Sequence, residues 1–271
     1  MPSIALCALG IALFALASGA HGYQVFRYRV WSFLPLSLAC FMEIIGYIFR
    51  ALSSVKDPYM ITYFVVQYFF IVVAPVLISA SLYVCLVKLI RWSDTIGVDM
   101  RSRYFLRPKL LLWIFITADV VTSIIQVAGA AMIGVAESNG RSPTTANDIL
   151  LAGLAVQTCA FVAFQILYAK LAFLLIRDAK ARIHVKGKQP LLLAIGAASI
   201  LVLLRTVFRL AETSEGVFGY ASSREVFFGC LEFAPIVVAV WLLAIWHPVR
   251  SLRETDPSAP GPMTTSEMAE P

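Results

Sequence analysis

Seven runs of mainly apolar residues constrain this chain more than any other feature of its sequence, because each is long enough to cross a bilayer as a helix. A membrane-spanning helix needs about 20 such residues. Only 14% of the chain is charged, against about 25% in a soluble domain, so water cannot solvate the whole surface. The sequence therefore predicts an all-α polytopic membrane protein, a bundle of seven transmembrane helices within residues 1–250. The predicted spans are 4–20, 31–52, 61–90, 110–135, 149–176, 191–211 and 226–246.

Basic residues are distributed unevenly between the connections. Fifteen of the 22 lysines and arginines lie in the first, third and fifth connections and in the tail, and three lie in the other connections. Cytoplasmic connections of membrane proteins are enriched in lysine and arginine. The pattern predicts an N-terminus outside and a C-terminus in the cytosol. It also accounts for the net charge of +6 without a nucleic-acid partner.

The two ends of the chain have different predicted roles. The first run resembles a signal peptide in its small residues Ala17–Ala20. It lacks a positively charged segment before it, and cleavage would export Arg27 and Arg29, so we predict a membrane span. Residues 251–271 are rich in proline, serine, threonine and glutamate, a composition that cannot form a core. We expect a disordered cytosolic tail.

Polar and ionisable residues inside the apolar runs recur at helical spacings. Such residues are costly in a membrane and usually face the interior of a bundle. Seven-residue separations place Glu43 with Arg50, Asp119 with Gln126, and Glu225 with Glu232 on common helix faces. The candidate site residues are Glu43, Tyr47, Arg50, Asp119, Gln126, Gln157, Arg205, Arg209, Glu212, Glu225 and Glu232.

These residues fall in the middle and outer half of the bilayer if the predicted topology holds. One polar cavity that opens outward and lines a substrate path would explain them. The alternative is that they pair as interhelical salt bridges and only hold the bundle together, since buried charges must be paired. Five acidic members outnumber three basic ones, which favours a cationic or zwitterionic guest.

Several chemistries find no support in the sequence. The histidines (His21, His184 and His247) avoid the middle of the runs, so we expect no catalytic metal site and no cofactor. Neither a nucleophile elbow nor a phosphate-binding loop is present. The seventh run has no lysine for a retinal Schiff base. We therefore expect no enzymatic activity.

Motifs in the polar runs resemble one known family. The segment Cys40-Phe-Met-Glu43-Ile-Ile-Gly46-Tyr47-Ile-Phe-Arg50 is similar to the second span of the fungal lipid-translocating exporter family, also called RTA-like (resistance to aminocholesterol). The resemblance covers residues 2–248. Further matches follow in order: Ala74-Pro75 with Tyr83, Asp119, Gln126-Val-Ala-Gly129, Gly153 with Gln157, Arg205-Thr-Val-Phe-Arg209-Leu-Ala-Glu212 with Gly216, Glu225-Val-Phe, and His247-Pro248.

The resemblance implies seven spans and a transporter of lipid-like amphiphiles, such as sphingoid long-chain bases, that contributes to resistance against toxic lipophilic compounds. It also implies a plasma-membrane location, with membrane lipids and the amphiphile as partners. Two rival hypotheses stay open. A seven-helix lipid sensor or receptor would signal through the basic cytosolic loops, and an intramembrane enzyme would modify a lipid.

Overall fold

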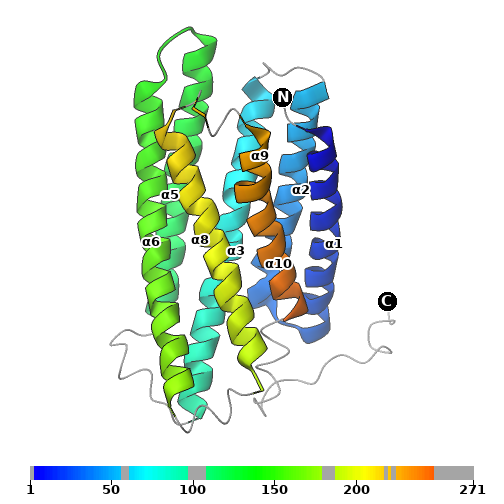
Figure 1. Cartoon of the computed structure of the whole chain (residues 1–271), viewed down its shortest axis with the longest axis vertical. Coiled ribbons are helices and arrows are strands. Elements are labelled where there is room, and N and C mark those ends of the chain that lie inside the picture. The colour runs from blue at the N-terminus through cyan, green and yellow to red at the C-terminus, as the bar shows by residue number, and fades with distance from the viewer. Residues whose placement is uncertain are drawn as a thin grey trace.

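The computed structural model describes residues 3–55, 61–96, 108–178, 187–216, 219–220 and 224–246, and within these every regular element is helical. Seven helical segments there are long and apolar enough to cross a membrane, which confirms the predicted seven-helix, all-α fold (Figure 1). The segments are α1 (Ile4–Tyr28), α2 (Leu34–Val55) after the short turn η1 (Trp31–Phe33), α3 (Ile61–Thr95), α5 (Pro108–Ser138), α6 (Thr144–Arg177), α8 (Gln189–Ser214), and the continuous α9 (Glu225–Phe227), η2 (Phe228–Phe233) and α10 (Ala234–Ile245).

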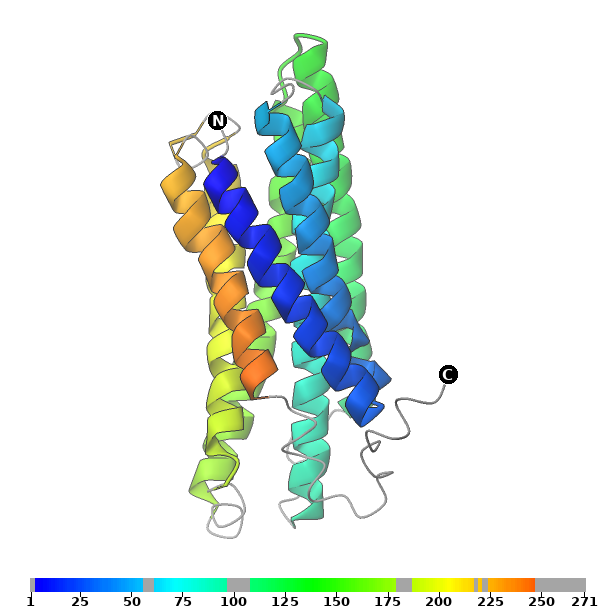
Figure 2. The same ribbon diagram turned by 90° about the vertical axis from the view of Figure 1, so that its right-hand side faces the viewer.

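The seven segments form a closed ring of neighbouring helices. In chain order α1 packs on α2, α2 on α3, α3 on α5, α5 on α6, α6 on α8 and α8 on α10, and α10 closes the ring on α1. The α3 helix also contacts α8 and α6, so it lies nearest the centre. The first helix begins at the same end of the bundle as α9 (Figures 1 and 2). We call this the N-terminal end.

The first helix continues beyond the apolar run that predicts a span over 4–20. His21 Nε2 lies 3.2 Å from the carbonyl oxygen of Val240, and Gln24 Nε2 donates to the carbonyl oxygen of Ala244 at 2.7 Å. Ala244 lies in the last turn of α10, where helix carbonyls lack partners within the helix, and Val240 lies one turn earlier. The Gln24 side chain thus satisfies an open carbonyl at the end of α10.

Two of the helices depart from regular α-helical hydrogen bonding. Pro75 is inside α3 and has no N–H for the carbonyl of Ile71, four residues earlier. In the seventh segment, residues 228–233 form one π-helical turn, in which the N–H of Ala234 bonds the carbonyl of Gly229. Both irregularities bear directly on the polar site.

The tail predicted to be disordered, 251–271, lies outside the described residues, as does the His247-Pro248 motif. The orientation of the termini stays a prediction.

Candidate polar site within the bundle

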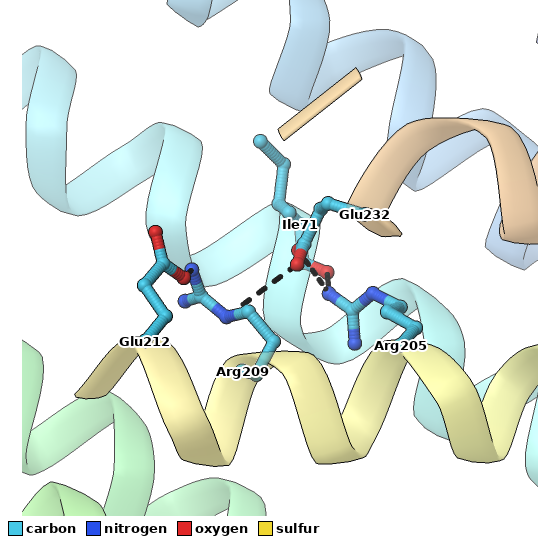
Figure 3. A network of polar contacts seen from close by, with 5 residues as sticks. All are labelled: Ile71, Arg205, Arg209, Glu212 and Glu232. Carbon is cyan, nitrogen blue, oxygen red and sulfur yellow. Dashed lines mark hydrogen bonds and ion pairs between the residues drawn. The ribbon is translucent and has the colours of Figure 1, made fainter. Parts of the chain in front are cut away.

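Arg205 of α8 joins three helices at the centre of the bundle. Its Nη2 atom donates to Glu232 Oε1 at 2.7 Å and to the carbonyl oxygen of Ile71 at 2.8 Å (Figure 3). Since Pro75 cannot donate to that carbonyl, the arginine satisfies a backbone group that the helix leaves open. Arg205 is 5% exposed and Glu232 is 2% exposed, so this is a buried ion pair.

Arg209 lies one turn further along α8 and extends the same network. Its Nη1 atom donates to Glu212 Oε2 at 2.9 Å, and its Nε atom lies 3.7 Å from Glu232 Oε2 (Figure 3). The guanidinium also lies 5.0 Å from the ring centroid of Tyr68 on α3, within range of a cation–π interaction. Glu232 is therefore shared between two arginines.

Arg50 forms a second contact between helices, closer to the N-terminal end. Its Nη2 atom lies 3.4 Å from Glu225 Oε1, and its guanidinium stacks 3.6 Å from the ring centroid of Phe228. One turn below on α2, Tyr47 is buried between aromatic rings, with centroids 5.8 Å from Phe14 and 5.6 Å from Phe233. Aromatic rings thus surround Tyr47, which lies between Glu43 and Arg50 along α2.

The π-helical turn accounts for the different partners of the two glutamates in the seventh segment. Their seven-residue spacing predicts one shared face for a regular α-helix. Residues 228–233 between them close with wider i→i+5 bonds, which shift the angular register. Glu225 consequently pairs with α2, whereas Glu232 pairs with α8.

Glu43 is the carboxylate that this network leaves without a partner. It is 2% exposed, and within the ranges that the structure describes it makes no hydrogen bond or ion pair. It lies within electrostatic range of Arg205 and Glu232. Each arginine of the network already has its own glutamate: Arg50 with Glu225, Arg205 with Glu232, and Arg209 with Glu212. The network therefore leaves one buried carboxyl group, that of Glu43, without a counter-ion among the described residues.

A second polar group lies between α3, α5 and α6. The Tyr83 hydroxyl donates to Asp119 Oδ2 at 2.7 Å, and Gln126 Nε2 donates to Gln157 Oε1 at 2.6 Å. Asp119 and Gln126 are each 1% exposed. The described contacts do not join this group to the arginine network. The sequence predicts one cavity for Asp119, Gln126, Gln157 and the residues of the arginine network, whereas their described contacts form two separate groups.

Some members of the site were outside the sequence-based candidates. Tyr68 and Phe228 stack on arginines, and the Ile71 carbonyl accepts from Arg205. The Ile71 carbonyl had a signal in the sequence, because Pro75 in a long helix marks a free acceptor four residues earlier. Among the described residues, no three His, Cys, Asp or Glu side chains are arranged to hold a metal ion.

Glycines set the separation of the helices that hold both groups. A Cβ atom on Gly46 would lie 2.8 Å from Ile71 Cγ1, so α2 approaches α3 closely beside the Arg205 contact. A Cβ atom on Gly153 would lie 3.0 Å from Gln126 Cγ. The amide pair therefore depends on a glycine on the opposite helix.

Comparison with known proteins places the chain in a family. A family model described as RTA1 like protein matches residues 36–255. Three similar proteins come from Saccharomyces cerevisiae. Protein RTM1 is 31% identical over 77% of this chain and 64% of the relative. Protoporphyrin uptake protein 1 is 27% identical over 78% of this chain and 67% of the relative. Sphingoid long-chain base transporter RSB1 is 25% identical over 92% of this chain and 72% of the relative.

The chain thus spans about two thirds of the length of these curated relatives. No solved structure matches it significantly. The family match covers six of the seven membrane-spanning segments, together with all eleven candidate site residues. The chain belongs to the RTA1-like family.

Proposed function

We propose that this protein translocates lipid-like amphiphiles with a positively charged amine headgroup, such as sphingoid long-chain bases, across a membrane. The observation that carries the proposal is the buried Glu43 carboxyl group, which has no counter-ion among the described residues, beside three arginines that each have a glutamate. A buried charge is costly unless it is paired. A guest with one positive charge would supply the missing partner.

The polar network would lower the main barrier to moving such a lipid. A charged headgroup near the centre of a bilayer costs several kcal/mol, while its hydrocarbon chain can stay in lipid throughout. Glu43 would pair with the amine, and the three arginines would keep the neighbouring glutamates from competing for it. Transport would run down a gradient or be coupled to another ion.

The names of two relatives support the movement of amphiphiles as the function, and one of the two names a base. One is called a sphingoid long-chain base transporter and another a protoporphyrin uptake protein. Both names describe movement of large, partly apolar molecules rather than their chemical conversion. We also propose that the basic connections lie in the cytosol and the N-terminus outside. The family resemblance alone suggests the plasma membrane as the location, with membrane lipids and the amphiphile as partners.

The test is flux of a fluorescent sphingoid base across liposomes that hold the purified protein. A contact with a charged group contributes about 1.5–3 kcal/mol, so Glu43→Gln is expected to lower the rate roughly 10- to 100-fold. Glu137→Gln makes the same chemical change at an exposed position and should leave the rate unchanged. An N-acylated analogue without the positive charge should show little protein-dependent flux.

Three results would redirect the proposal. Equal rates for Glu43→Gln and Glu137→Gln would remove Glu43 from the path. Binding without flux above empty liposomes would favour the lipid sensor, which needs a cytosolic partner instead. Recovery of a chemically altered lipid would favour an intramembrane enzyme.

A further inference from the structure

We propose that Asp119 is a proton-binding site, separate from the arginine network, through which this protein couples transport to a proton gradient. The inference about coupling rests on the proposed function, and the inference that Asp119 holds a proton does not. Asp119 lies in the middle of α5, between α3 and α6.

The Asp119 carboxyl group is buried and has one unpartnered oxygen. It is 1% exposed. Tyr83 donates to Oδ2 at 2.7 Å, while Oδ1 has no hydrogen-bond partner in the described part of the chain. Unlike the glutamates of the arginine network, it has no ion pair with any described residue. A carboxylate in this position is left with a single neutral donor.

The side chains around this contact are aromatic and supply no cation. The Tyr83 ring centroid lies 5.2 Å from Phe115, 6.2 Å from Phe161 and 4.9 Å from Phe164. All four rings are buried. A charged carboxylate in such surroundings is strongly disfavoured, and binding of a proton neutralises it.

Three other titratable side chains on the adjacent helices contact other groups or are exposed. On α3, the Lys88 ammonium lies 4.8 Å from the ring centroid of Phe33, which belongs to η1. On α6, Tyr168 donates to the carbonyl oxygen of Leu192 on α8, and Lys170 is exposed. Tyr83 is thus the titratable group that faces Asp119 from α3, and the α6 residues of the aromatic cluster beside it are phenylalanines.

The neighbouring hydroxyls on α5 do not neutralise the carboxyl either. Ser123 Oγ donates to the backbone carbonyl of Asp119 at 2.7 Å, and Thr122 Oγ1 donates to that of Ala118 at 2.8 Å. Both hydroxyl protons are therefore used by the helix backbone. Oδ1 is left as the position where a proton binds.

The first experiment measures the proton directly and needs no transport. Infrared spectra of the purified protein should contain the C=O stretch of a protonated carboxylic acid that is lost in Asp119→Asn. Asp148→Asn, the same change at an exposed position of α6, should keep the band. Tyr83→Phe retains the carboxyl but removes its hydrogen bond, so the band should move to higher frequency. A spectrum that is the same in wild type, Asp119→Asn and Tyr83→Phe would overturn the proton site.

The second experiment measures coupling. The probe is a trimethylammonium amphiphile, which has a fixed charge and cannot carry a proton itself. In liposomes with the wild-type protein, an imposed proton gradient should change the rate of its flux several-fold. In Asp119→Asn the ratio of rates with and without the gradient should fall to about one, while Asp148→Asn keeps the wild-type ratio.

The outcomes separate the two proposals. A wild-type flux that does not respond to the gradient overturns the coupling, even if the amphiphile is transported. A wild-type protein without flux for any amphiphile overturns the proposed function, and the infrared band still decides whether Asp119 holds a proton.

Discussion

Removing the guanidinium of Arg205 is expected to be among the most destabilising single changes in the bundle. Arg205→Met keeps a long, flexible side chain, but it leaves the buried Glu232 carboxylate without its 2.7 Å partner. Breaking a buried ion pair from one side costs about 3–5 kcal/mol. The Ile71 carbonyl also loses its donor, and an unsatisfied buried acceptor costs a further ~1–3 kcal/mol.

The partner substitution separates the charge effect from the loss of packing. In Arg205→Met combined with Glu232→Met, no unpaired charge is left between α8 and the seventh segment. Replacing both members of a buried pair with apolar side chains is often neutral or stabilising. The double variant should therefore recover most of the free energy of unfolding that the single variant loses.

The assay is unfolding of the purified protein in mixed micelles by titration with sodium dodecyl sulfate, followed by circular dichroism. Arg141→Met, at an exposed position, is the matched control and should stay within about 0.5 kcal/mol of wild type. The reasoning is refuted if Arg205→Met behaves like this control. It is also refuted if the double variant is no more stable than the single one.

Two further predictions concern the contact between α5 and α6. Gly129→Ala places a Cβ atom 3.0 Å from the backbone nitrogen of Leu150 and should destabilise the protein by about 1–3 kcal/mol in the same titration. Gly19→Ala has nothing within 4 Å of its new Cβ atom and should stabilise the protein by up to about 1 kcal/mol. Equal effects of the two substitutions would contradict the close approach of α5 and α6. A double-mutant cycle of Gln126→Leu and Gln157→Leu should give a coupling free energy of about 0.6–1.7 kcal/mol, as for hydrogen bonds between membrane helices. Additive effects on the free energy of unfolding would show that the 2.6 Å contact between the two amides contributes nothing to stability.

The number of helices could be predicted from the sequence because the apolar runs exceed the thickness of a bilayer. The extent of α1 could not. The apolar run that predicts a span over 4–20 ends before His21, a residue that favours water when it is considered alone. The helix continues to Tyr28, since His21 and Gln24 find carbonyl groups of α10 more than 200 positions away.

The polar residues were found by their spacing, but their pairing was not. Helical periodicity places Glu43 and Arg50 on one face of α2, and it contains no information on the opposite helix. The structure pairs Arg50 with the start of the seventh segment and leaves Glu43 alone. Among the candidate site residues the acidic ones outnumber the basic ones by two, and only the three-dimensional contacts identify Glu43 and Asp119 as the two without an ion pair.

The π-helical turn of residues 228–233 has a consequence for how relatives of this protein should be compared. A turn closed by i→i+5 bonds contains one residue more than an α-helical turn. A relative that lacks this residue would keep its equivalent of Glu232 in register with Pro235, but would present its equivalent of Glu225 about 100° further round the helix. A one-residue gap in an alignment at this turn would then indicate that the equivalent of Glu225 faces a different neighbouring helix. Two homologues that both have this glutamate would in that case pair it with different arginines.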